Sequence, residues 1–131
     1  MFDKKLFPIL VIGSFLSSIT ASYAEFKLDD KNKLNDQQLI EKFSGKIRTC
    51  EPDSRSFVMK FFKNRKLEAY NNRGDDQGKW SVKDGKLCAD WDYSWRPWCR
   101  NFYQSPTNPN QVGYRGASTG TFYTCTLKPI K

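Results

Sequence analysis

The stretch from Gly78 to Trp91, GKWSVKDGKLCADW, decides the fold of this chain. Asp84 and Gly85 stand at its centre, and this dipeptide is typical of a type I′ turn, in which both residues have positive φ. Counting outward from the turn pairs Val82 with Leu87, Ser81 with Cys88, Trp80 with Ala89 and Lys79 with Asp90. The stretch therefore predicts a β-hairpin.

Alternation of side chains gives this hairpin one apolar face and one polar face. The apolar face carries Trp80, Val82, Leu87, Ala89 and Trp91, and the polar face carries Ser81, Lys83, Lys86, Cys88 and Asp90. A slip of one residue would move both tryptophans to the polar face. The pattern therefore specifies the register of the hairpin as well as its existence.

The first 24 residues have the pattern of a secretory signal peptide. Lys4 and Lys5 precede an apolar run over residues 6–16, and Ser22 and Ala24 are small residues at the −3 and −1 positions of a cleavage site. An uncleaved membrane anchor is the alternative, but the run is shorter than the roughly 20 residues that a span needs. We therefore expect cleavage after Ala24, and a periplasmic or secreted protein.

The chain after this cleavage site would have 107 residues, with 20 basic and 13 acidic side chains and a net charge of +7. This length suits one small domain. All four cysteines fall in this part, and an even number of cysteines in a small exported domain indicates disulfides. The sequence has no histidine and no Cys-x-x-Cys, so it lacks the ligand spacing of a zinc site, and we expect neither metal nor cofactor.

The rest of the chain predicts a mainly β domain over residues 35–131, preceded by a flexible arm over residues 25–34. Residues 35–45 favour a short helix, with Asn35 as its cap, Gln38 in a capping box and Gly45 at its end. Strands are expected at 46–50, 56–62, 66–70, 98–104, 111–115 and 121–127, around the central hairpin, with a polar loop at 71–77. Seven or eight such strands predict one small antiparallel sheet that curls into a barrel or half-barrel.

The four cysteines follow from this strand order. Cys88 and Cys99 lie on successive strands, which favours a bridge between them, and Cys50 and Cys125 would then join the first strand to the last. Loops of these sizes contribute about 3 to 5 kcal/mol each on the chain-entropy model. The other two pairings are compatible with the sequence as well.

The hairpin pattern Gly78-x-Trp80-x-Val82-x-Asp84-Gly85-x-Leu87-Cys88, followed by Trp91 and Cys99, resembles the small exported proteins of Gram-negative bacteria grouped as domain of unknown function 995 and their relatives. Residues 40–46 resemble the opening element of that family, and residues 120–122 its closing strand. The resemblance covers residues 39–127 and implies an exported β-rich fold without assigned catalytic residues. Cys50 and Cys125 lie outside the family pattern.

The absence of histidine excludes Ser-His-Asp and Cys-His nucleophilic sites. Carboxylates remain as candidates for acid–base chemistry, namely Asp75, Asp76, Asp90 and Asp92. We interpret Asp75 and Asp76 as a solvated turn and Asp90 as the cross-strand partner of Lys79. Asp92 has no second carboxylate at an inferable distance, as glycoside hydrolysis requires. No catalytic residue is therefore assigned.

The segment from Trp91 to Trp98 is the most unusual in composition, because it holds three tryptophans, Tyr93 and Pro97. On a rigid loop such aromatic side chains stack on sugar rings or bases, or bury into a protein partner. Trp91 belongs to the core by its place in the alternation, whereas Tyr93 and Trp95 are expected to be exposed. Tyr93, Trp95 and Arg96 are therefore candidate ligand-binding residues.

A cluster of basic residues surrounds the turn near residue 64. Lys63 and Arg65 are its candidate binding residues, for acidic polysaccharide, lipid headgroups or, least favoured in an exported chain without a nucleic-acid motif, nucleic acid. Solubility is the simpler explanation of the charge.

These observations favour an exported, non-enzymatic binding module for an anionic envelope component, a glycan or a host protein. Two alternatives from other classes are an inhibitor of an envelope-degrading enzyme, presenting a rigid loop to a cleft, and a histidine-free glycan hydrolase that uses carboxylates. Binding to glycans without turnover would separate the binding module from the hydrolase. Capture of a protein from envelope extract would separate it from the inhibitor.

Overall fold

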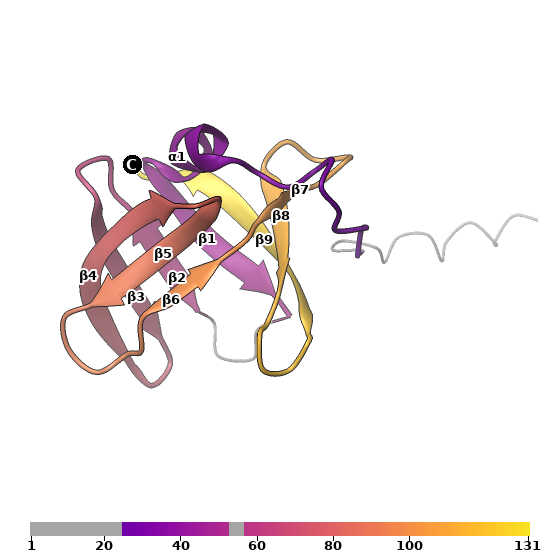
Figure 1. Ribbon diagram of the computed structural model, residues 1–131. Coiled ribbons are helices and arrows are strands. Elements are labelled where there is room, and N and C mark those ends of the chain that lie inside the picture. The colour runs from indigo at the N-terminus through magenta and orange to yellow at the C-terminus, as the bar shows by residue number, and fades with distance from the viewer. Residues whose placement is uncertain (1–24, 53–56) are drawn as a thin grey trace, which may run out of the picture.

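The fold is one nine-stranded antiparallel sheet, curled into a half-barrel, with one short helix across one end (Figure 1). It is seen in a computed structural model that describes residues 25–52 and 57–131. The elements are α1 (Asp36–Phe43), β1 (Lys46–Glu51), β2 (Val58–Phe61), β3 (Lys66–Asn71), β4 (Gly74–Lys83), β5 (Lys86–Trp91), β6 (Trp98–Arg100), β7 (Tyr103–Gln104), β8 (Gln111–Arg115) and β9 (Phe122–Pro129). The order in the sheet is β6-β5-β4-β3-β2-β1-β9-β8-β7. The predicted fold class is confirmed.

The central hairpin has the predicted register. Trp80 pairs with Ala89 and Val82 with Leu87, and Asp84 and Gly85 both have positive φ. Gly78 is required where β4 meets the end of β5, because a Cβ there would lie 2.0 Å from the backbone oxygen of Asp90. The chain then leaves β5 at Trp91 and enters the loop of residues 92–97.

Helix α1 closes one end of the half-barrel. Asn35 caps it and completes the predicted capping box with Gln38, and Gly45 follows with a φ of 74°. Phe43 packs edge-on against Phe61 of β2 and against Phe102, with ring centroids 5.1 and 5.0 Å apart. The barrel interior beneath α1 is therefore filled with aromatic rings.

The core extends from α1 along the inner face of the sheet. Its largest fully buried side chains are Trp80, Phe43, Phe61, Phe102, Leu39, Met59, Leu67, Leu87 and Val112. The Nε1 of Trp80 donates a hydrogen bond to the backbone oxygen of Phe62 at 2.9 Å, so this ring is fixed at its polar atom too.

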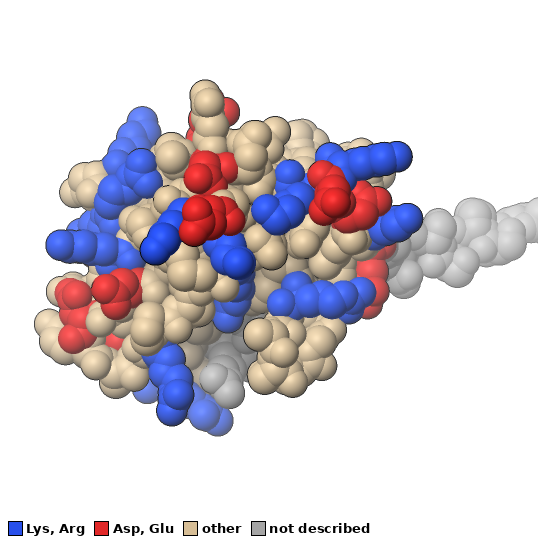
Figure 2. Space-filling model, viewed as in Figure 1, with Lys and Arg blue, Asp and Glu red and all other residues tan. Residues whose placement is uncertain are grey.

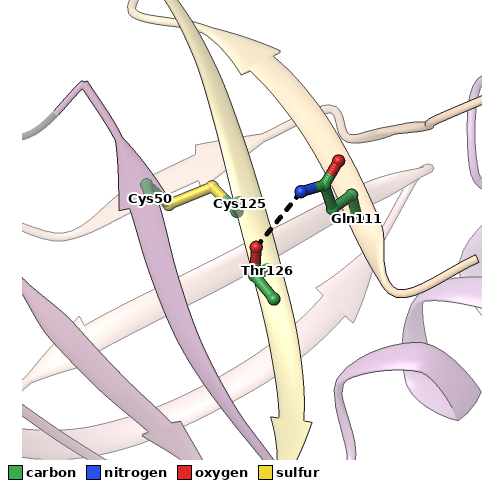
Figure 3. The surroundings of a disulfide bond; sticks show 4 residues. All are labelled: Cys50, Gln111, Cys125 and Thr126. Atoms are coloured by element: carbon green, nitrogen blue, oxygen red, sulfur yellow. Dashed lines mark hydrogen bonds between the residues drawn. A yellow bond between two sulfur atoms is a disulfide. The ribbon is translucent and has the colours of Figure 1, made fainter. Parts of the chain in front are cut away.

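Both predicted disulfides form, Cys50–Cys125 and Cys88–Cys99. Cys50 and Cys125 are register partners on β1 and β9, and their bridge lies beside a hydrogen bond from Gln111 to Thr126 (Figure 3). Cys88 and Cys99 are register partners on β5 and β6. Each disulfide therefore joins two neighbouring strands of the sheet.

Two strand predictions need correction. The expected polar loop over 71–77 is mostly strand, because β3 and β4 pair to the end and Asn71 faces Gly74 across a tight turn. The expected strand over 98–104 divides into β6 and β7, which form the two edges of the sheet. The chain changes edge between them, where Phe102 turns into the core.

The segment at 25–34, predicted as an arm, contacts the sheet along its length. Leu34 is buried, and its N–H donates to the backbone oxygen of Phe102 at 2.9 Å. Phe26 packs edge-on against Phe122 at 5.2 Å. The predicted signal peptide, residues 1–24, lies outside the described residues.

Candidate functional site

A cavity of about 810 Å³ is lined by residues of the sheet and of the 92–97 loop, and no residue of α1 lines it. Its walls come from the inner faces of β1, β2, β6, β8 and β9, and its rim from the β3–β4 turn and the 92–97 loop. Beneath α1, the interior of the barrel is filled by the fully buried Phe43, Phe61 and Phe102.

Two arginines and two aromatic rings form a cluster in the wall of this cavity. The guanidinium carbon of Arg100 lies over the rings of Trp98 and Tyr114, 4.3 and 4.7 Å from their centroids. That of Arg48 lies 5.8 Å from each of the same two rings. We call Arg48, Arg100, Trp98 and Tyr114 the arginine–aromatic cluster.

Strand alternation explains why these charges point inward. Arg48 precedes Cys50 by two residues on β1, and it is 3% exposed between its register partners Met59 and Leu127. Arg100 faces Leu87, a fully buried residue, across β5 and β6. Residues two apart share a face of a strand, so the inward Cys50 brings Arg48 inward with it.

The cavity is strongly positive. Arg73 and Arg96 stand at its rim in addition to Arg48 and Arg100, and Asp75 is the one carboxylate among the described residues that line it. Within residues 25–52 and 57–131, no carboxylate forms a salt bridge with Arg100. Burial lowers the pKa of Arg100, whereas Tyr114 and Tyr123 raise it, and an arginine so placed stays charged at neutral pH.

Further aromatic side chains line the cavity beside the arginine–aromatic cluster. The ring of Trp95 packs 5.0 Å from Trp91 and 5.0 Å from Phe57. Tyr114 stacks on Tyr123, with centroids 4.9 Å apart and planes at 16°. Rings from the 92–97 loop and from β8 and β9 therefore frame the two guanidiniums.

Asp76 holds the 92–97 loop at the rim. Its carboxylate accepts hydrogen bonds from the backbone N–H groups of Tyr93, Ser94 and Trp95 at 3.1, 2.9 and 2.9 Å, and from that of Gln77 at 2.8 Å. Burial raises the pKa of Asp76, but these four donors outweigh it, so the pKa lies below its ordinary value. The interpretation of Asp76 as part of a solvated turn was wrong, because the side chain is 5% exposed.

The structure brings two of the predicted binding residues to the cavity, Trp95 and Arg96. Trp95 is partly buried against the core, so the prediction that it is exposed needs correction. Tyr93 is exposed as predicted, at 76%, but it lines a separate small pocket on the outer face of β3 and β4. Trp80 is buried as predicted, and Trp91 is half-buried.

Lys63 and Arg65 lie away from this cavity, at the β2–β3 turn near the helix end of the barrel. The side chain of Lys63 lies next to Gly45, directly after α1, and the guanidinium carbon of Arg65 lies 4.5 Å from the ring centroid of Trp80. Figure 2 shows basic side chains spread over one face of the molecule, with smaller groups of acidic side chains among them. The basic turn and the cavity are therefore two separate features.

Sequence reasoning missed Arg48 and Arg100. Arg48 lies two residues from Cys50 on β1, and Arg100 lies two residues from Trp98 on β6. Residues two apart on a strand point to the same side of the sheet. Strand parity would have placed both charges inside, but a buried arginine contradicts the usual preference for apolar interiors.

Two of the carboxylates that the sequence offered for acid–base chemistry have other partners in the described part of the chain. Asp90 faces Lys79 across β4 and β5 as predicted, and Asp76 has a lowered pKa, the opposite of what a general acid requires. The described residues contain no group of three or more His, Cys, Asp or Glu side chains able to hold a metal ion. Nor do they include a helix with the length and apolar character that crossing a membrane requires.

The fold and the cavity were compared with known proteins at three levels. No protein-family model, curated protein or solved structure matches this chain. The resemblance of the hairpin to exported Gram-negative proteins stays a prediction, and the cavity is interpreted from its own chemistry.

Proposed function

We propose that this protein is an exported, non-enzymatic binding module whose cavity takes an anionic ligand. The observation that carries the proposal is the position of Arg100, half-buried over Trp98 and Tyr114 and without a carboxylate partner among the described residues. Placing a charged guanidinium in an apolar interior costs free energy unless it is paired. An anionic ligand would supply the missing partner.

The surroundings of Arg100 support this proposal. A second arginine, Arg48, contacts the same rings, and two more stand at the rim against one carboxylate, Asp75. A cavity with four arginines and one carboxylate among its described lining residues concentrates anions through its field. The aromatic walls offer stacking area for the rest of the ligand.

Two variants that each replace one positive charge by a neutral glutamine test the proposal. Arg100→Gln removes the central charge, and Lys63→Gln removes one charge from an exposed residue at the other end of the barrel. Glucuronic acid, inorganic phosphate and octanoate would be titrated while the tryptophan fluorescence is followed. We expect saturable binding of at least one anion, weakened about tenfold or more by Arg100→Gln and unchanged by Lys63→Gln.

Two results would contradict it. One is that none of the three anions binds saturably. The other is that both variants weaken binding equally, because the effect would then reflect net charge and not the cavity. Circular dichroism of each variant shows whether the fold is retained.

One observation favours a second candidate function, inhibition of an envelope-degrading enzyme. Tyr93 is 76% exposed at the tip of a loop that Asp76 and the Cys88–Cys99 disulfide hold in place. An exposed aromatic on a fixed loop suits insertion into a cleft. Tyr93→Ala should abolish capture of an enzyme from envelope extract if this function is correct, and leave anion binding unchanged.

Export is part of the proposal, together with a periplasmic or secreted location. It rests on residues 1–24 and on the two disulfides, which suit an oxidising compartment. Mass spectrometry of the exported protein should find a chain that begins at Glu25 with two disulfides. A product that retains Met1 would contradict the cleavage prediction.

A further inference from the structure

We infer that the anionic ligand is a carboxylated sugar, with its carboxylate on Arg100 and its ring against the aromatic wall near Trp95. This inference rests on the proposed function and narrows it to one class of ligand. Three properties of the cavity support it. The guanidinium of Arg100 lies over two aromatic rings, the end of the barrel beneath α1 is filled, and polar groups stand at the rim.

The guanidinium of Arg100 is suited to a planar anion. Its central carbon lies 4.3 Å from the ring centroid of Trp98 and 4.7 Å from that of Tyr114. A guanidinium stacked on rings keeps its N–H groups for acceptors in its own plane. A carboxylate presents two oxygens in one plane and matches this edge with two parallel hydrogen bonds.

The closed end of the barrel argues against a long acyl chain. Phe43, Phe61 and Phe102 are fully buried and in ring contact beneath α1, where a fatty-acid tail would have to run. The Cys50–Cys125 disulfide occupies the inner face of β1 and β9 beside the cavity. These rings leave a linear chain no path under α1, so the space of about 810 Å³ suits a compact ring better than a linear chain.

The rim supplies partners for hydroxyl groups. Asn71 and Ser94 line the cavity as well. The Oδ1 of Asn71 accepts a hydrogen bond from the N–H of Arg73 at 2.7 Å, which fixes the amide and leaves its NH₂ as a donor. Asp75 adds an acceptor that would repel a second carboxylate and pair with a hydroxyl. A ligand with one carboxylate and several hydroxyls satisfies this set, whereas a flat aromatic acid leaves it unused.

Trp95 is the stacking residue in this arrangement. Its ring lies against Trp91 and Phe57 on the cavity wall and remains partly exposed. Tyr93, two residues earlier on the same loop, points to a different pocket and provides a matched control. Loss of one stacking aromatic at such a site weakens binding about 5- to 150-fold.

The experiment compares matched ligands on the folded chain without its signal peptide. Galacturonic acid, its neutral methyl ester, glucose 6-phosphate, octanoate and benzoate would be titrated by calorimetry into the native protein, Arg100→Lys, Trp95→Ala and Tyr93→Ala. We expect galacturonic acid to bind at least tenfold more tightly than every other ligand. Arg100→Lys and Trp95→Ala should each weaken that binding about tenfold, and Tyr93→Ala should leave it unchanged.

The outcomes separate this inference from the proposed function. Tighter binding of glucose 6-phosphate, octanoate or benzoate would overturn the carboxylated sugar and leave an anion-binding cavity. Equal binding of the methyl ester would overturn the role of the carboxylate. Binding of none of the ligands would overturn the proposed function itself. The melting temperature of each variant shows whether it folds. If a variant does not fold, the affinities of the native protein for the five ligands test the inference without it.

Discussion

The backbone N–H of Trp95 donates a hydrogen bond to Oδ2 of Asp76 at 2.9 Å. Through this bond a buried carboxylate on β4 fixes the position of an aromatic ring at the cavity rim, 19 residues further along the chain. The same carboxylate also binds the N–H groups of Tyr93 and Ser94. The shape of the rim therefore depends on one ionised side chain.

Asp76→Asn should destabilise the fold in a pH-dependent way. The pKa of Asp76 is lowered in the folded state, so the ionised carboxylate stabilises the fold above the unfolded-state pKa of about 3.9 and loses this effect as the pH falls through the folded pKa. We expect the free energy of unfolding at pH 7 to fall by about 1.5 to 3 kcal/mol. The asparagine side chain has an NH₂ in place of one carboxylate oxygen, so backbone N–H groups that bonded to that oxygen lose their acceptor. Urea unfolding from pH 7 to pH 2.5 should show the difference shrinking below pH 4. Asp75→Asn is the control, since its side chain is exposed.

Replacement by phenylalanine should change the free energy of unfolding differently at the two tryptophans of the central hairpin, Trp80 and Trp91. Trp80 donates from Nε1 to the backbone oxygen of Phe62, whereas the buried Nε1 of Trp91 has no acceptor among the described residues. Trp80→Phe therefore loses a hydrogen bond and leaves a gap, while Trp91→Phe removes an unsatisfied donor. We expect Trp80→Phe to cost at least about 1 kcal/mol more in the free energy of unfolding. Equal costs would contradict the difference in hydrogen bonding.

Removal of the two disulfides should differ in cost with the length of the loop that each closes. Cys50–Cys125 spans 75 residues and Cys88–Cys99 spans 11. On the chain-entropy model these loops contribute about 4.5 and about 2.8 kcal/mol. Replacing both cysteines of a pair by alanine should therefore cost more for Cys50 with Cys125, as measured by thermal unfolding. The shorter bridge should matter more for the loop, and its removal should raise proteolysis within residues 92–97.

The contact of the 25–34 segment with the sheet depends on a glycine. A Cβ on Gly113 would lie 2.7 Å from Cζ of Phe26 and 3.0 Å from Cζ of Phe122. Gly113→Ala should displace Phe26 and destabilise the fold by about 1 to 3 kcal/mol. In a Phe26→Ala background the same change should cost clearly less, and a double-mutant cycle measures this coupling. A coupling near zero would show that this contact adds nothing to stability.

The sequence by itself determined the hairpin and the helix, and it favoured the disulfide pairing that forms. Asp84 and Gly85 fix the turn, and the alternation from Gly78 to Trp91 allows one register in which both tryptophans face inward. The capping box at Asn35 is likewise local, and Cys88 and Cys99 lie on successive strands. These features rest on short-range geometry, which a sequence expresses directly, whereas the Cys50–Cys125 pair, 75 positions apart, was inferred from the remaining cysteines.

The tertiary structure alone decided what the inside of the half-barrel contains. Arg48 and Arg100 are 52 positions apart in the sequence, and they meet over Trp98 and Tyr114 only because the sheet curls until β6 approaches β8. Asp76 looked like a surface residue, because its partners are backbone N–H groups of a distant loop, which no side-chain pattern reveals. Curvature and backbone donors are properties of the folded chain. Strand parity gives the side of the sheet on which Arg48 and Arg100 lie, but it does not show that they come together.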